Sequence, residues 1–276
     1  MAIIGPEDYL EPACLLCGDS FGEEPKLKPI PQERIISKLD EYMSRRDYGG
    51  AERHLIYWLG EAQAARDRRG ELMLRGELVG HYRKTSQREK AFENIEAALR
   101  LVKELGFEDT ISAGTCYVNC ATAACAFGEN GRALELFNSA LPIYESKAAT
   151  RPELLGGLYN NMALTLTALG KFGEAQDSFK KALEIMGNVP GGSLEEAMTL
   201  LNMADLVAAE YGMETGESRI YSLLDEALSK LEGTDAPHDG YYAFVLEKCA
   251  PVFEHYGYFA AAQELKRRSE DIYERA

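Results

Sequence analysis

Three asparagines recur at a near-constant spacing and offer the clearest candidate chemistry in this chain. Asn119, Asn161 and Asn202 are 42 and 41 residues apart, and each lies two residues before an alanine. A side-chain carboxamide carries both a donor and an acceptor, so it can pair with the backbone of another polypeptide without demanding a particular side chain. Asparagine is a mediocre helix former, and packing gives no reason for it to recur at one phase. The pattern predicts a row of backbone-binding amides; the alternative is that these amides satisfy neighbouring backbone or one another.

A Cys-x-x-Cys pair near the N-terminus is the one motif with metal-ligand spacing. Cys14 and Cys17 have the spacing of a zinc knuckle, but zinc needs four ligands and the chain has no second pair of this kind. His54 or His81 could complete the set, or two molecules could share one ion. The alternative is that the two thiols anchor an irregular arm by apolar burial. The sequence therefore predicts no cofactor, with zinc as the single possibility.

The other thiols do not suggest catalysis. Cys116, Cys120 and Cys125 share one predicted helix, and small buried thiols are common at helix packing positions. A nucleophile requires a base beside it, and none of the phosphate-loop, dinucleotide, metalloprotease or serine-hydrolase motifs occurs. The chain is predicted not to be an enzyme.

A repeated helix pattern positions these residues. The pattern begins with a small residue, followed by a large apolar residue four positions later and a second small residue seven positions later. It occurs as Ala91-Ile95-Ala98, Ala133-Phe137-Ala140 and Ala175-Phe179-Ala182. Residues at these offsets share one helix face, and alanine at the crossing point lets two helices approach closely. Weaker copies begin at Ala51, at Ile220 after an inserted segment 212–216, and at Ala261. The spacing predicts an all-α solenoid.

The pattern also divides the chain. Residues 1–31 contain five prolines and are predicted to form an irregular arm. Residues 32–276 form the repeat domain, with a weak break near 232–240. About six helix pairs are predicted, at 32–47 with 49–66, 70–84 with 87–105, 110–127 with 130–146, 152–169 with 172–187, 193–211 with 217–232, and 239–256 with 258–275.

One unit is diagnostic of a family. The segment Tyr159-Asn160-Asn161-Met162-Ala163-Leu164-Thr165-Leu166, followed by Gly170-Lys171-Phe172-Gly173-Glu174-Ala175, closely resembles a tetratricopeptide repeat. A unit of about 42 residues is similar to the long repeats of kinesin light chains and related bacterial proteins. The resemblance covers roughly residues 32–276. It implies a right-handed superhelix whose first helices line a concave groove that holds peptides or partner helices, and it implies no enzymatic activity.

The resemblance also assigns the candidate site. In the family, the place held by Asn119, Asn161 and Asn202 faces the groove, where asparagines commonly hold the backbone of a bound peptide. Arg83 and Lys84 come from an earlier helix and could meet a carboxylate of the partner. The remaining groove positions in this register are Asn160, Thr122, Leu164, Thr167, Leu201 and Asp205.

Charge and composition narrow the partners and the compartment. The formal net charge of −15 disfavours nucleic acid and anionic lipid surfaces and favours a neutral or basic partner. The first residues lack the basic and apolar regions of a signal peptide, and no window reaches the ~18 apolar residues of a membrane span. Six cysteines are too few for a disulfide scaffold. We expect a cytoplasmic protein whose oligomeric state the sequence leaves open.

Together these patterns predict a protein-interaction module, an adaptor or regulatory receptor that holds a partner segment in its groove. Two alternatives remain at this point. One is a sensor of short signalling peptides, and the other is a metal-linked structural or oligomeric protein organised by Cys14 and Cys17.

Overall fold

The chain folds as a row of paired helices. The computed structural model describes residues 28–233 and 238–275, and this part holds twelve α-helices and no strand. None of these helices is long and apolar enough to cross a membrane. The helices are α1 (Gln32–Ser44), α2 (Tyr48–Ala64), α3 (Arg68–Lys84), α4 (Arg88–Glu104), α5 (Ile111–Ala126), α6 (Asn130–Glu145), α7 (Pro152–Ala168), α8 (Phe172–Met186), α9 (Ser193–Tyr211), α10 (Met213–Glu232), α11 (Gly240–His255) and α12 (Phe259–Tyr273).

Small residues let the two helices of a pair pack closely. In α8, Ala175, Phe179 and Ala182 are completely buried, as the repeat pattern predicts. Glycine takes the same role on the first helix of two pairs. A Cβ atom on Gly156 would lie 2.5 Å from the Met186 sulfur, and one on Gly114 would lie 2.6 Å from the Tyr144 ring. A side chain at either position would force Met186 or Tyr144 to shift, so glycine favours the close approach of α7 to α8 and of α5 to α6.

The turns inside the pairs share one hydrogen bond, which fixes a common register. The N–H after the turn donates to the carbonyl five residues earlier, as a helix ends in a Schellman-type arrangement. The bonds are Asp47 to Tyr42, Gln87 to Tyr82, Glu129 to Ala124, Lys171 to Leu166 and Tyr258 to Phe253, at 2.8–2.9 Å. Each accepting residue therefore marks the same place in its repeat.

The fifth pair differs from the prediction. No segment is inserted at 212–216, because α10 begins at Met213, directly after Gly212. Gly216 is buried in the first turn of α10, where an added Cβ would lie 2.8 Å from Val207. Gly216 thus takes the place of the alanine, and Ile220 takes that of the large residue. The predicted pattern specified alanine, whereas any small residue, here glycine, fits the crossing point.

The last pair is shifted by one residue. Ala262 is 2% exposed and packs in the core, whereas Ala261 is partly exposed. The pattern that began at Ala261 was therefore wrong by one position.

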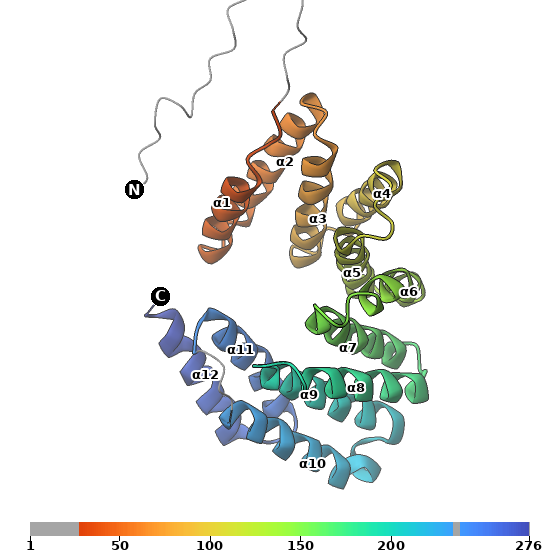
Figure 1. The fold of residues 1–276 in the computed structure, drawn as a ribbon. Helices are drawn as coiled ribbons and strands as arrows, with labels where there is room; N and C mark the ends of the chain where they lie inside the picture. The colour runs from red at the N-terminus through yellow and green to blue at the C-terminus, as the bar shows by residue number, and fades with distance from the viewer. Residues whose placement is uncertain (1–27, 234–237, 276) are drawn as a thin grey trace, which may run out of the picture.

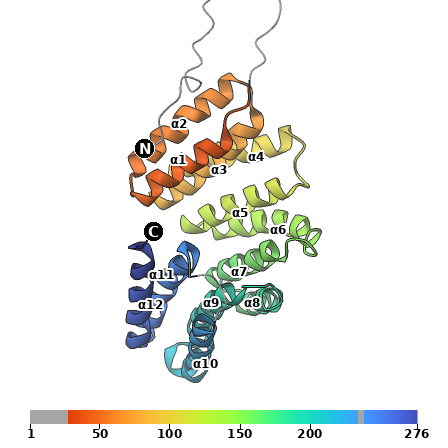
Figure 2. The same ribbon diagram turned by 60° about the vertical axis from the view of Figure 1, so that its left-hand side comes forward.

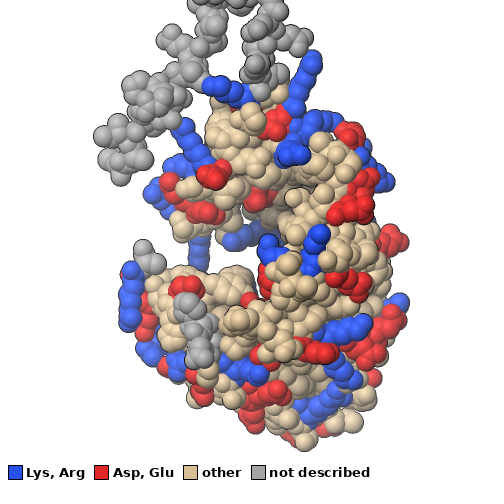
Figure 3. Space-filling view, viewed as in Figure 1, with Lys and Arg blue, Asp and Glu red and all other residues tan. Residues whose placement is uncertain are grey.

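The helix pairs form a curved array with an inner and an outer layer. Odd-numbered helices contact the odd-numbered helices of the next pair, α3 with α5, α5 with α7, α7 with α9 and α9 with α11. The array bends so that α1 and the α11–α12 pair face each other across an opening (Figures 1 and 2). Figure 3 shows that the molecule is hollowed there, with basic side chains around the opening. The odd-numbered helices thus line the concave side.

The apolar interior is divided into three clusters that follow one another along the array. The first contains Ile35, Leu55, Leu74 and their neighbours from α1 to α4. The second runs from α3 to α8, and the third runs from α7 to α12. The pairs α3–α4 and α7–α8 each contribute to two clusters, which is the nearest-neighbour packing expected of a repeat array.

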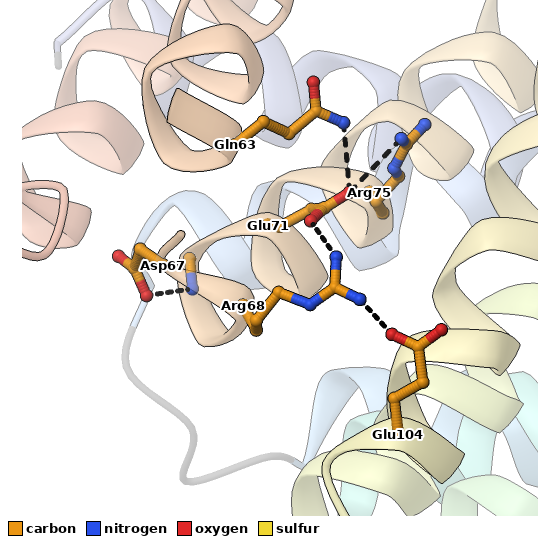
Figure 4. Close-up of polar contacts among 7 residues, drawn as sticks. Gln63, Asp67, Arg68, Glu71, Arg75 and Glu104 are labelled. Atoms are coloured by element: carbon orange, nitrogen blue, oxygen red, sulfur yellow. Dashed lines mark hydrogen bonds and ion pairs between the residues drawn. The ribbon is translucent and has the colours of Figure 1, made fainter. Parts of the chain in front are cut away.

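A buried ion-pair network ties α3 to its neighbours (Figure 4). Glu71 is 5% exposed and accepts hydrogen bonds from Gln63 at 3.1 Å, Arg68 at 3.0 Å and Arg75 at 3.3 Å. Arg75 also donates to the side chain of Asn94 at 3.0 Å. A buried carboxylate requires such partners, because an uncompensated charge is strongly destabilising. The network therefore fixes α2, α3 and α4 relative to one another.

The N-terminal end of the described chain is anchored at the same junction. The carboxylate of Asp67 accepts from the backbone N–H of Gly70 at 2.9 Å, which caps α3, and from the N–H of Ile30 at 2.9 Å. Ile30 is 7% exposed. Residues 28–31 are non-helical, and Ile30 packs against the first turn of α3.

Tyrosine hydroxyls bonded to carboxylates join helices along the array. They are Tyr82 to Glu52 at 3.1 Å, Tyr159 to Glu145 at 3.2 Å, Tyr241 to Glu195 at 2.6 Å, Tyr256 to Asp205 at 2.7 Å, Tyr258 to Asp225 at 2.7 Å and Tyr273 to Glu247 at 3.3 Å. The bonds of Tyr82, Tyr159, Tyr241 and Tyr273 each link two helices. Those of Tyr256 and Tyr258 link the turn between α11 and α12 to α9 and α10.

Candidate peptide-binding groove

The predicted asparagines lie at one register on three inner helices. Asn119 on α5 lies five residues before Ala124, and Asn161 on α7 lies five residues before Leu166. Those two residues accept the matching turn bonds, so the two asparagines are equivalent. Asn202 follows on α9 and touches α7 through its side chain. We call this register the ladder position.

Asn119 opens onto a hollow of about 680 Å³ between α3 and α5, here called the first hollow. Its walls are mostly apolar, with Leu72 and Met73 from α3 and Ile111 from α5. Phe107 lies beside the hollow, and the Arg69 guanidinium lies 5.0 Å from its ring centre. The first hollow can therefore accept an apolar group next to a backbone-binding amide.

Asn161 opens onto a smaller hollow of about 390 Å³, here called the second hollow. It brings together four predicted residues, Arg83 from α3, Thr122 from α5, and Asn161 and Leu164 from α7. Leu164 is 40% exposed, which is unusual for leucine in a packed helix. A cation, an amide and an exposed apolar side chain thus face one space.

The amides differ in whether they already have a partner. Asn202 donates through Nδ2 to the side-chain oxygen of Asn160 at 3.0 Å, across α9 and α7. Within residues 28–233 and 238–275, the side-chain amides of Asn119 and Asn161 have no hydrogen-bond partner. The structure thus places two of the predicted amides in a protein contact and leaves two available in the groove.

Several other predicted positions are occupied by the protein itself. Leu201 is 2% exposed and belongs to the third core cluster, so its side chain is not available to a ligand. Asp205 accepts from Tyr256, and the Lys84 ammonium lies 5.5 Å from the centre of the Tyr48 ring. Register alone could not separate these side chains from those that face the groove, because each bends toward a neighbouring helix.

The threonines of the groove are bonded within their own helices. The Thr122 hydroxyl donates to the Asn119 carbonyl at 2.9 Å, and the Thr167 hydroxyl donates to the Ala163 carbonyl at 2.9 Å. Each oxygen still has a free lone pair, because a hydroxyl can donate once and accept twice. Thr122 can therefore accept one hydrogen bond from a ligand in the second hollow.

The thiols of α5 are mainly structural, as predicted for Cys116 and Cys120, which are buried. A hydrogen bond between these two thiols, together with burial, holds the pKa of Cys120 well above its usual range. Cys125 differs, because it is partly exposed on the second hollow with its sulfur 3.0 Å from the Thr165 hydroxyl. Burial raises the pKa of Cys125 as well, so its thiol stays protonated near neutral pH.

Cys14 and Cys17, with the zinc site predicted for them, lie outside the described residues. In the part of the chain that is described, no three side chains of the metal-binding types are gathered together. His54, considered above as a zinc ligand, has its Nε2 atom 3.1 Å from the carbonyl oxygen of Ile35.

Three members of the ladder position were missed from the sequence. Ser37 on α1 lies five residues before Tyr42, Glu77 on α3 lies five residues before Tyr82, and Lys248 on α11 lies five residues before Phe253. Glu77 lines the first hollow together with Asn119. Burial raises the pKa of Glu77, and the charge of Asp40 adds to the effect. The position of the turn in the sequence indicates all three residues, whereas the recurrence of asparagine indicates none of them.

Comparison with known proteins agrees with this geometry. Residues 71–146 and 154–212 match the tetratricopeptide repeat family. No curated protein sequence matches the chain. The fold is similar to that of BtubC (BKLC) from P. vanneervenii, with a TM-score of 0.64, 21% identity, and 73% of this chain and 81% of that chain covered. A variant of the putative kinesin light chain TPR-like repeats from Podosopora anserina gives a TM-score of 0.50, 18% identity, and 73% and 93% coverage. Residues 71–146 and 154–212 are thus tetratricopeptide repeats, and the fold of the chain is like that of kinesin light chain repeats.

Proposed function

We propose that this protein binds an extended segment of another polypeptide in its concave groove and carries out no chemistry on it. The observation that carries the proposal is the pair Asn119 and Asn161. Both amides occupy the ladder position, both border a hollow, and neither has a hydrogen-bond partner among the described residues. An unpaired amide costs little while water reaches it, and it becomes a specific contact when a peptide backbone replaces that water.

The two hollows supply the side-chain contacts that such a segment needs. The first hollow takes an apolar side chain between Leu72 and Ile111. The second hollow adds the exposed face of Leu164 and the Arg83 guanidinium. Arg83 forms no ion pair with any described residue, so its charge remains available to a carboxylate. Backbone contacts give affinity in this arrangement, and the hollows give specificity.

The net charge of the protein indicates which class of ligand it binds. With a net charge of −15, the protein repels polyanions, so we propose a protein or peptide ligand, neutral or basic overall, rather than nucleic acid or a membrane surface. We place the protein in the cytoplasm as an adaptor or regulatory receptor. A short signalling peptide would use the same contacts as a segment of a larger partner.

A displayed library of random 14-residue linear peptides tests the proposal directly. Selection on the wild-type protein should enrich a family of related peptides, and fluorescence anisotropy then gives the affinity of a synthetic copy. The double variant Asn119→Ala/Asn161→Ala should bind it about tenfold or more weakly, since each lost hydrogen bond is worth about 1 kcal/mol.

A matched control is present on the outer layer. Asn138 is exposed on α6, so Asn138→Ala should leave the affinity unchanged. Circular dichroism must show that all variants remain helical. If no related peptides are enriched, or if the double variant binds like wild type, groove binding through these amides is refuted.

A further inference from the structure

The ladder position carries opposite charges on the two sides of the amides. Five residues before the turn acceptor lie Ser37 on α1, Glu77 on α3, Asn119 on α5, Asn161 on α7 and Lys248 on α11. The amides are thus bracketed by an acid on the side of the N-terminal pairs and a base on the last inner helix. The row is directional, so it distinguishes the two orientations of an extended segment.

Among the described residues, neither Glu77 nor Lys248 is held in an ion pair, unlike two other acids of the first helix pairs. Glu71 on α3 and Glu52 on α2 form ion pairs with Arg75 and Lys90. Glu77 forms no ion pair within residues 28–233 and 238–275. It nevertheless lines the first hollow and is desolvated there. A carboxylate in that setting is relieved by an incoming cation, because the opposite charge offsets the loss of hydration.

At the other end, the Lys248 ammonium stands beside an exposed aromatic pair. It lies 5.4 Å from the centre of the Phe244 ring, and Phe244 in turn stacks on Tyr241 at 6.3 Å. Phe244 and Tyr241 are 43% and 48% exposed, so this end offers both a charge and an apolar surface. No carboxylate in the described part of the chain is paired with Lys248.

We propose that the groove accepts its ligand in one direction, with a Lys or Arg side chain of the ligand on Glu77 and an Asp or Glu side chain on Lys248. Asn119 and Asn161 hold the backbone between them. This inference rests on the proposed function, since it specifies the chemistry of the same ligand. The rows of charge on groove and ligand are complementary in one orientation and repulsive in the other, which gives specificity more than raw affinity.

The spacing of the helices sets the length of the ligand. Four steps between neighbouring inner helices, at roughly 8–10 Å each, separate Glu77 from Lys248 by about 30–40 Å along the groove. An extended chain covers ~3.3 Å per residue, so the two charged ligand residues are separated by about ten positions. A 14-residue peptide is long enough to reach both.

Charge exchange is the decisive experiment. The random 14-residue library is selected on wild type and on the double variant Glu77→Lys/Lys248→Glu. Wild type should enrich peptides with a basic and an acidic residue about ten positions apart in one order, and the double variant should enrich the opposite order. Two synthetic peptides, the best wild-type ligand and a copy with its basic and acidic residues exchanged, should reverse their preference between the two proteins by tenfold or more.

The control variant exchanges charges on the outer layer. Glu135 on α6 and Lys103 on α4 are exposed, so Glu135→Lys/Lys103→Glu should select the same peptides as wild type. If peptides bind but show no charge order, or if the groove double variant keeps the wild-type preference, the directional proposal is overturned while the proposed function stands. If neither protein enriches a peptide, the proposed function fails and the directional proposal fails with it.

Discussion

The side-chain amide of Asn202 on α9 donates a 3.0 Å hydrogen bond to the side-chain oxygen of Asn160 on α7. Both residues are partly buried. We therefore expect Asn202→Ala and Asn160→Ala each to lower the free energy of unfolding by about 1 kcal/mol. Because the two variants remove the same bond, the double variant should lose less than the sum, with a coupling of about 0.5–1.5 kcal/mol. Urea denaturation of the four proteins measures this coupling, and strictly additive losses would contradict the contact.

The buried carboxylate of Glu71 should be among the most sensitive positions in the chain. Glu71→Ala leaves Arg75 with a buried charge and without its carboxylate, and removal of one partner of a buried pair typically costs about 3–5 kcal/mol. Glu104, which pairs with Arg68, is half exposed, so Glu104→Ala should cost about 1 kcal/mol or less. Denaturant midpoints of the two variants give the comparison. Equal losses would show that the buried network does not hold α2, α3 and α4 together.

Two adjacent glycines before α9 should respond differently to alanine. A Cβ on Gly192 would lie 2.3 Å from the backbone oxygen of Met186, which cannot move without breaking the end of α8. Gly191 has a φ of +78° but open space around it. Gly192→Ala should therefore cost about 3 kcal/mol through overpacking, and Gly191→Ala about 1 kcal/mol through backbone strain. Thermal unfolding that ranks them in the reverse order would refute this account.

Tyr258 should contribute to the free energy of unfolding at neutral pH and lose that contribution at alkaline pH. Burial and the hydrogen bond to Asp225 raise the pKa of Tyr258 to about 12. The neutral phenol is thus favoured by the fold, and its contribution is complete below pH ~10, the pKa of an unfolded tyrosine. It is lost as the pH rises from there through about 12. Urea denaturation of wild type and Tyr258→Phe between pH 8 and 11.5 should show their difference shrinking above pH 10, and a constant difference would argue against the linkage.

Most of the fold was predictable because close packing restricts the residue types. Ala91, Ala133 and Ala175 are completely buried where the pattern placed them, and every predicted helix is present within a few residues of its predicted bounds. The pattern failed where another small residue replaced alanine, at Gly216, and where a run of alanines left the phase ambiguous, at Ala262. In both places the helix was predicted correctly, but the residue that contacts the neighbouring helix was not.

The candidate site was less predictable, because a register tells which face a residue occupies but not where its side chain bends. Asn202 and Asn161 share one register, yet Asn202 bonds to Asn160 while Asn161 faces a hollow. The search for a repeated residue type also concealed Glu77 and Lys248, whose chemistry differs from that of the asparagines but whose place is the same. The binding roles of all these residues remain predictions.

The division of the apolar interior into three clusters has a consequence for cooperativity. A cluster can open while the next one stays packed, so amide hydrogen exchange should report several opening free energies rather than one. Exchange should be fastest in α1 and α2, which belong only to the smallest cluster. A segment seated along the groove would touch helices from all three clusters. Binding of such a segment should therefore slow amide exchange well beyond the residues that the segment contacts, because the three clusters would then open together.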